Sequence, residues 1–139
     1  VIEVLNTFGE QCHGAGMQLC YHNHDFEFEV LGNEVAYDLM LRACDAELVQ
    51  FELDLFWATH AGVDARTYLQ ADPKRFPLCH VKDRTPGGDM VSVGKGAIDF
   101  AALFAAGSGL QHYFVEHDRP EDSLASVQYS IETLQALRF

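Results

Sequence analysis

Four short segments with the residue pattern of buried strands recur along the chain about 30 residues apart, with helix-like segments between them. We expect these strands at residues 17–22, 48–54, 76–83 and 112–118. Strict alternation of strands and helices predicts a parallel sheet, because each helix carries the chain back to start the next strand in the same direction. We therefore expect an α/β fold of parallel β/α units. Two architectures fit: a small doubly wound sheet, or half of an eight-stranded (β/α)8 TIM barrel.

The helix-like segments carry apolar residues at the three- and four-residue spacing of an amphipathic helix. We expect helices from Val1 to near Gly14, and at 33–44, 64–72, 99–107 and 124–137. Asp99 suits the N-cap of the fourth helix, and Gly107 suits its C-cap. The longest loop, residues 84–98, follows a strand, where loops often carry function. No linker or low-complexity segment interrupts the pattern, so we expect residues 1–139 to form one domain.

The apolar content and charge of the chain narrow the classes of function. With 139 residues, 48% of them hydrophobic, the chain can build a core. A net charge of -12 disfavours nucleic acid as a main partner, because phosphate binding needs clustered Lys and Arg. No apolar run approaches the roughly 20 residues of a membrane span, and the opening "VIEVLNTFGE" lacks a secretory pattern. We expect a cytoplasmic protein with no membrane partner.

The four cysteines, Cys12, Cys20, Cys44 and Cys79, form no CxxC pair. Cys20 and Cys79 lie in strand-like runs, which predicts that they are small buried hydrophobic side chains. A disulfide-stabilised fold is therefore not expected.

Each expected strand ends in side chains that bind metals or move protons. They are His22, with His24 and Asp25 beyond; Asp54; His80, with Lys82 and Asp83 beyond; and Glu116, with His117 and Asp118 beyond. Parallel strands of one sheet bring their carboxyl ends to the same side, where α/β folds place their sites. If Asp54, His80 and Glu116 face a common centre, they form a ligand set for Mn²⁺, Zn²⁺ or Co²⁺. A histidine from the first strand would supply a fourth ligand.

The alternative for any one of these residues is an ordinary structural role. A single His or Asp at a strand end is more often a cap or a hydrogen-bonded core residue than a ligand, but four consecutive strands ending in this way favour a metal. In "FELDLFWATHAG", Glu52 lies deeper than Asp54, and we expect it to be a buried carboxylate that is hydrogen-bonded to Lys, Arg or Tyr. Phe56 and Trp57 are expected to pack, although an aromatic beside a strand end could line a sugar pocket.

Five stretches together resemble the sugar phosphate isomerase/epimerase family of xylose isomerase-like barrels. They are "YHNHDFEFEV", "FELDLFWATHAGVD", "CHVKDR", "VGKGAIDF" and "YFVEHD". The resemblance extends from about residue 16 to residue 139, and it rests on the order and spacing of the stretches rather than on any one of them. It implies a (β/α)8 barrel of about twice this length, of which this chain corresponds to the C-terminal half.

The resemblance also implies a site with one divalent metal at the carboxyl ends of the strands. Its ligands would be Asp54, His80, Glu116 and, where the family commonly has Glu, His22; His24 is the alternative first-strand ligand. Glu116 would also act as the base, with Lys82 as an electrophilic or acid partner and His24 as a further catalytic group. Lys82 could instead pair with Asp83 or Glu52. Similarly, Lys95 in "VGKGAIDF" could bind an anionic end of the substrate, or the segment could be a simple turn into a helix.

Three functions follow from these observations. The first is a metal-dependent sugar or sugar phosphate isomerase or epimerase that abstracts a proton next to a carbonyl. Because His22 replaces a carboxylate, a dehydratase or lyase acting on an inosose or keto-sugar is the second. The third is an inactive fragment or a non-catalytic half-barrel. A nuclease of the endonuclease IV type is disfavoured by the net charge of -12. Since half a barrel exposes two strand edges, we also expect a homo-oligomer.

Overall fold

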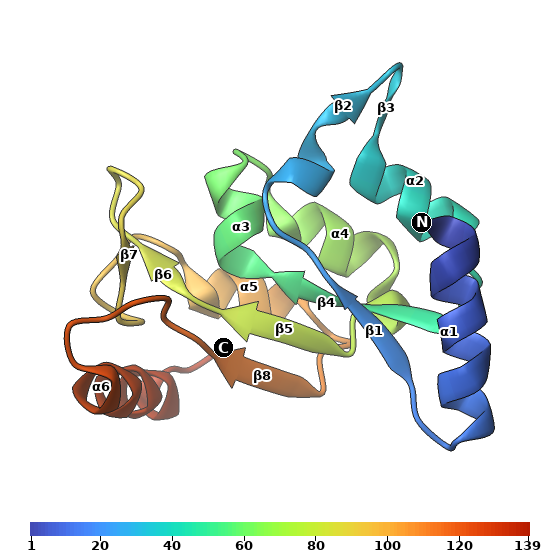
Figure 1. The fold of residues 1–139 in the computed structure, drawn as a ribbon. Helices are drawn as coiled ribbons and strands as arrows, with labels where there is room; N and C mark the ends of the chain where they lie inside the picture. The colour runs from blue at the N-terminus through green and yellow to red at the C-terminus, as the bar shows by residue number, and fades with distance from the viewer.

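The four expected strands pair in chain order in a single parallel sheet. The computed structural model describes all residues, 1–139, and its main sheet has the order β1 (Leu19–His22), β4 (Val49–Asp54), β5 (Leu78–Val81) and β8 (His112–Val115) (Figure 1). A doubly wound sheet reverses its strand order at a switch point, whereas this sheet always advances in one direction. The winding is therefore that of a barrel. Each strand is shorter than expected: β1 and β4 begin later, whereas β5 and β8 end before the polar residues that were expected to close them.

The five expected helices are present. They are α1 (Ile2–Gly14), α2 (Ala36–Ala43), α4 (Ala65–Ala71), α5 (Phe100–Ala106) and α6 (Ser123–Ala136). Asp99 caps α5, since its side chain accepts a hydrogen bond from the N–H of Ala102, and Gly107 follows the last residue of α5 as expected. Helix α2 begins later than expected because β3 (Glu34–Val35) pairs with β2 (Val30–Leu31) in a hairpin.

Several short elements were not expected from the sequence. Helix α3 (Leu55–His60) follows β4 without a loop, and its six residues are too few to show a helical repeat. The other short elements are the 3-10 turns η1 (Phe26–Phe28) and η2 (Pro73–Arg75) and the hairpin of β6 (Asp83–Arg84) and β7 (Met90–Val91). That hairpin occupies much of the expected 84–98 loop.

The two faces of the sheet differ in composition. On one face of β4, Val49, Phe51 and Leu53 are fully buried against the helices, and α4 and α5 lie behind the sheet in the view of Figure 1. Burial of each such side chain contributes roughly 1.5–3 kcal/mol to stability. Gln50 and Glu52 alternate with them and point to the other face, which no helix covers and which corresponds to the inside of a barrel.

Helix α1 packs closely on this framework at Gly9. A Cβ atom added at Gly9 would lie 2.7 Å from the carbonyl oxygen of Leu48, immediately before β4. Only glycine permits this approach, so α1 is fixed against the sheet. None of the helices is both long and apolar enough to cross a bilayer.

The cysteines are all free thiols, and one expectation about them was wrong. Cys79 is fully buried on the helix-covered face, as expected. Cys20 is only half-buried, because it lies two residues before His22 and shares the open face with it. Burial and the nearby charge of Glu52 raise the pKa of the Cys20 thiol to about 11.

Candidate functional site

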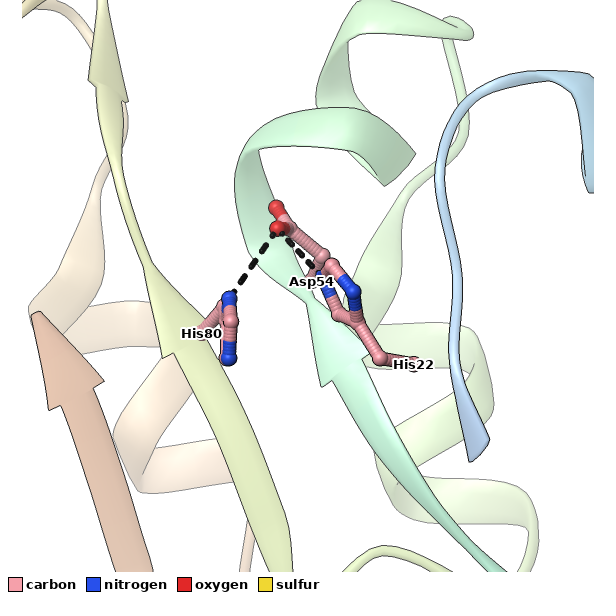
Figure 2. Close-up of side chains that lie close together, drawn as sticks. All are labelled: His22, Asp54 and His80. Carbon is pink, nitrogen blue, oxygen red and sulfur yellow. Dashed lines mark hydrogen bonds and ion pairs between the residues drawn. The ribbon is translucent and has the colours of Figure 1, made fainter. Parts of the chain in front are cut away.

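Three ligand-type side chains from neighbouring strands converge on the open face of the sheet. His22 at the end of β1, Asp54 at the end of β4 and His80 in β5 each offer a ligand atom, and these atoms all lie within 4.8 Å of one another. Asp54 Oδ2 lies 2.9 Å from His22 Nε2 and 3.7 Å from His80 Nδ1 (Figure 2). A carboxylate between two imidazoles is a donor set that divalent cations bind.

The register of the sheet explains why these three residues meet. Asp54 is level with His80, whereas His22 is level with Glu52, one step below. The strands of a barrel are staggered in this way, so side chains from different steps reach the same layer. Consequently the His22 ring lies beside Asp54, and not beside its own register partner.

Asp54 is held in place on all sides and is fully buried. Its Oδ1 accepts a hydrogen bond of 3.0 Å from the N–H of Trp57, which caps α3, and Oδ2 faces the two imidazoles. Its own N–H donates to Oδ1 of Asn23, a side chain that is also fully buried. Asn23 was not singled out from the sequence, although its position between His22 and His24 places it on the opposite face from both.

Lys82 is the cation that balances Asp54 in this structure. Its side chain is 2% exposed, and its Nζ lies 3.0 Å from Asp54 Oδ2, 2.7 Å from Glu116 Oε2 and 3.9 Å from Asp118 Oδ2. Burial alone would lower the pKa of this ammonium, but the close contact with Glu116 and the charge of Asp54 outweigh burial and raise it. Lys82 is therefore charged at neutral pH, and the alternative pairings with Asp83 or Glu52 are wrong.

Glu116 follows β8 and is the accessible carboxylate in contact with His80. Its side chain is 40% exposed, and Oε2 lies 2.6 Å from His80 Nδ1. Burial alone would raise the pKa of Glu116, but Lys82 and His80 outweigh burial and lower it. Glu116 is thus an ionised carboxylate at neutral pH. It contacts His80 but lies outside the group of three whose ligand atoms are all mutually close.

Two atoms of this cluster have no properly aligned hydrogen bond. His80 Nδ1 and Glu116 Oε2 are both buried and close together, yet the directions of their bonds do not form a hydrogen bond, and the contact of Glu116 Oε2 with Lys82 is misaligned too. We regard these short distances as electrostatic contacts. Buried polar atoms without a partner are costly, and a cation bound between them would pair both.

Glu52 has a partner other than those expected. Its Oε1 lies 3.1 Å from His80 Nε2, and its side chain is 16% exposed. No Lys, Arg or Tyr is hydrogen-bonded to it, so that expectation was wrong. The sequence could not show this contact, because it depends on the stagger that brings β4 and β5 into register.

His24 lies at the rim of the site and not among the ligand atoms. Its backbone N–H donates to Glu27, and its exposed ring stacks on Phe26 at 5.8 Å between ring centres. The ring centre is 5.1 Å from that of His22 and 5.4 Å from that of Trp57. Trp57 packs on Phe56, as expected, and its buried indole N–H has no partner. Of the two first-strand histidines, His22 is the one that joins the group.

The "VGKGAIDF" segment is shaped by Asp83 and does not enter the site. The buried carboxylate of Asp83 accepts hydrogen bonds from four backbone N–H groups, at residues 84, 94, 96 and 98. A Cβ atom at Gly96 would lie 2.2 Å from Asp83 Oδ1, so glycine is required there. Lys95 points to α6, with Nζ 4.5 Å from the centre of the Tyr129 ring. The segment is a turn into α5, and Asp83 is a structural residue that sequence reasoning did not separate from its neighbours.

Four parallel strands in chain order, with a polar cluster at their carboxyl ends, define half of a (β/α)8 barrel. Solved structures confirm this class. A sugar phosphate isomerase/epimerase from Parabacteroides distasonis matches with a TM-score of 0.86 and 29% sequence identity, over 96% of this chain and 50% of that chain. The resemblance that the sequence motifs indicated is therefore present in the structure as well.

More distant structures show the same fold. The 3-keto-D-glucoside 4-epimerase from E. coli matches with a TM-score of 0.77 and 17% identity, over 99% of this chain and 52% of that one. A xylose isomerase domain protein from Alicyclobacillus acidocaldarius matches with a TM-score of 0.70 and 14% identity, over 94% and 53%. No family model and no curated protein matches the chain. The chain spans about half the length of the solved structures it resembles.

Proposed function

We propose that the chain provides the metal ligands and the base of a divalent-metal-dependent sugar isomerase or epimerase. The observation that carries this proposal is the convergence of His22, Asp54 and His80 at the carboxyl ends of three adjacent strands. The likeness to a sugar phosphate isomerase/epimerase supports it. The proposed substrate is a small sugar or sugar phosphate, and the proposed reaction begins with abstraction of a proton next to a carbonyl.

The residues present fit a divalent metal. The proposed ligands are His22, Asp54, His80 and Glu116, a mixture of imidazole and carboxylate donors that suits Mn²⁺, Zn²⁺ or Co²⁺. The unaligned atoms His80 Nδ1 and Glu116 Oε2 would both gain a partner. Charge also favours a cation, because the carboxylates around the site outnumber its one ammonium, that of Lys82.

The side chains can divide the proton transfers between them. A bound divalent ion would supply Lewis acidity that polarises the carbonyl and hydroxyl oxygens of the sugar. Glu116, ionised and partly exposed, takes the proton from the carbon next to the carbonyl. Lys82 holds a positive charge beside Glu116, where it stabilises negative charge that develops on the sugar oxygen. His24, at the rim, donates a second proton to the sugar to complete isomerisation or epimerisation and regains one from solvent, while Glu116 releases to solvent the proton that it took.

A dehydratase or lyase is a second candidate, and His22 favours it. Where the family commonly has a carboxylate, this chain has an imidazole that contacts Asp54. Asp54 is fully buried and Glu52 nearly so, which leaves Glu116 as the carboxylate that both contacts His80 and is accessible. A single base suffices to remove a proton and expel a leaving group from an inosose or keto-sugar. A non-catalytic half-barrel is the third candidate, because the relatives are twice as long.

Metal analysis of the purified protein tests the site. After equilibration with Mn²⁺ and dialysis, the parent protein should retain the ion. Asp54→Asn, which preserves shape but not charge, and His80→Ala should lose most of it. His112→Ala is the matched control, because His112 is an exposed histidine at the opposite end of β8. If both site variants retain as much Mn²⁺ as the parent, the proposal fails.

A solvent-exchange experiment separates the three candidates. Ketoses, inososes and 3-keto-glycosides would be incubated in D₂O with the Mn²⁺-loaded protein and followed by NMR. An isomerase or epimerase should place deuterium next to the carbonyl and form an isomer, whereas a lyase should release water and form an unsaturated product. Metal binding without exchange on any substrate would support the non-catalytic half-barrel.

A further inference from the structure

We infer that Glu52 is a positioning residue that orients His80, so that the metal is bound through Nδ1 of this histidine and not through Nε2. The inference rests on the proposed metal site, and it assigns a role to the deeper acid of "FELDLFWATHAG". Glu52 acts through His80 and touches neither substrate nor metal.

The three carboxylates around His80 differ in the cations that pair with them. Asp54 and Glu116 lie on the Nδ1 side and share the ammonium of Lys82. Glu52 lies on the Nε2 side, and no Lys or Arg lies within ion-pair distance of it. Because its side chain is only 16% exposed, little water is available to it. Nε2 of His80 is thus the one side-chain nitrogen within ion-pair distance of this carboxylate, although the contact, like those at Nδ1, is not aligned as a hydrogen bond.

Glu52 also lies on a lower step of the sheet than Asp54. It is two residues before Asp54 on β4, in register with Leu78, whereas Asp54 is in register with His80. Glu52 also lies outside the group of three close ligand atoms. Its carboxylate contacts the ring from below the site, and this contact leaves Nδ1 turned toward Asp54 and Glu116.

Together these observations describe a carboxylate–histidine pair behind a metal site. A metal-binding histidine commonly donates its other ring N–H to a carboxylate, which fixes the ring and selects the nitrogen that binds. Nδ1 is buried without an aligned partner and faces Asp54 and Glu116, two of the proposed ligands, so it is the atom that remains for the metal. Loss of such a supporting carboxylate typically weakens metal affinity by about 10- to 100-fold.

Nuclear magnetic resonance of ¹⁵N-histidine-labelled protein tests the orientation directly, with Zn²⁺ as the probe. On addition of Zn²⁺, Nδ1 of His80 should move to the shift of a metal-bound nitrogen, while Nε2 should keep its proton. Assignment uses the spectrum of His80→Gln. A metal-bound Nε2 would overturn the inference while leaving the metal site intact. Absence of any Zn²⁺-dependent shift would overturn the proposed metal site itself, and the inference with it.

Affinity measurements with Co²⁺ and Zn²⁺ provide the second test. Glu52→Gln keeps an oxygen that can accept from Nε2–H, so affinity should fall by about 10-fold; Glu52→Leu keeps no acceptor and should approach a 100-fold loss. Asp38→Asn makes the same change of charge outside the site and keeps an acceptor for the Tyr68 hydroxyl, so its affinity should be unchanged. Unchanged affinity in both Glu52 variants would contradict the inference. So would a loss in Glu52→Gln as complete as that in Asp54→Asn, because Glu52 would then be a ligand.

Discussion

The two faces of the sheet differ in the kind of contacts that their side chains make, and β4 contributes side chains to both. Val49, Phe51 and Leu53 point to the helices and are fully buried, whereas Glu52 and Asp54 point to the open face. On the helix-covered face the packing contacts are apolar and non-directional, so one apolar side chain can often replace another of similar volume. On the open face, each polar atom depends on a particular partner at a particular distance. Alternate residues of β4 therefore have different roles: those that face the helices stabilise the fold, and those on the open face form the candidate site.

The largest expected effect concerns the open face as a whole. Strands β1 and β8 leave unpaired edges, and Phe114 of β8 is 47% exposed beside them. We predict that the chain self-associates, with β8 of one copy against β1 of the other, because a two-fold axis would close both edges at once. Light scattering after size-exclusion chromatography should give twice the mass of the chain. A monomer at every concentration would contradict this prediction.

The helix-covered face should be the more sensitive to loss of volume. Phe51 is fully buried and contacts the rings of Tyr21, Tyr37 and Phe76. Phe51→Ala should lower the free energy of unfolding by about 3–5 kcal/mol. Gln50→Ala, next to it on the open face, should cost less than about 1 kcal/mol. Urea denaturation measures both free energies of unfolding. Equal losses in the two variants would contradict the claim that the helix-covered face is the more sensitive to loss of volume.

The open face should respond to loss of charge instead. Lys82→Met leaves Asp54 and Glu116 without their ammonium and should cost about 3 kcal/mol, since Asp54 is fully buried. The same variant should bind Mn²⁺ more tightly than the parent, because one positive charge beside the ion has been removed. Calorimetry measures the affinity. Weaker binding by a folded Lys82→Met would show that Lys82 supports the site in another way.

The smallest expected effect is the pH dependence contributed by Tyr21 of β1. Burial, then its hydrogen bond to Glu27 and the charge of that carboxylate, raise the pKa of Tyr21 above 10.0. The unfolded chain therefore loses this proton first as pH rises. The contribution of Tyr21 is complete below pH 10 and declines as pH rises from there toward the folded-state pKa. The difference in urea midpoint between the parent and Tyr21→Phe should be constant up to about pH 9 and should narrow as the pH rises above 10; a difference that stays constant to pH 11 would contradict this.

The sequence predicted more of the fold than of the contacts in the site. Alternation placed the four strands, and parallel pairing brought His22, Asp54 and His80 to one side, because these features depend on backbone direction alone. The alternative partners of Lys82 (Asp83 and Glu52) and the expected Lys, Arg or Tyr partner of Glu52 were wrong. The observed partners depend on the stagger between strands and on side-chain orientation, which periodicity does not specify.

Two further misses have a similar cause. Helix α3 is too short to show a repeat, although Asp54 is a typical N-cap residue and was a signal for it. Asp83 follows Lys82 directly but points to the other face, and three of its four backbone partners come from residues 94–98, more than ten residues further along the chain. In each case one side chain has a role that only tertiary contacts reveal.

Anomalous diffraction from a crystal soaked in Mn²⁺ is the most direct test of the central claim that the open face carries a metal site. The account predicts an anomalous peak in contact with His22, Asp54 and His80, with Nδ1 of His80 as the binding atom and Glu52 on its far side. The same map from Asp54→Asn should lack the peak. A peak elsewhere, or none among these residues at saturating Mn²⁺, would contradict the account.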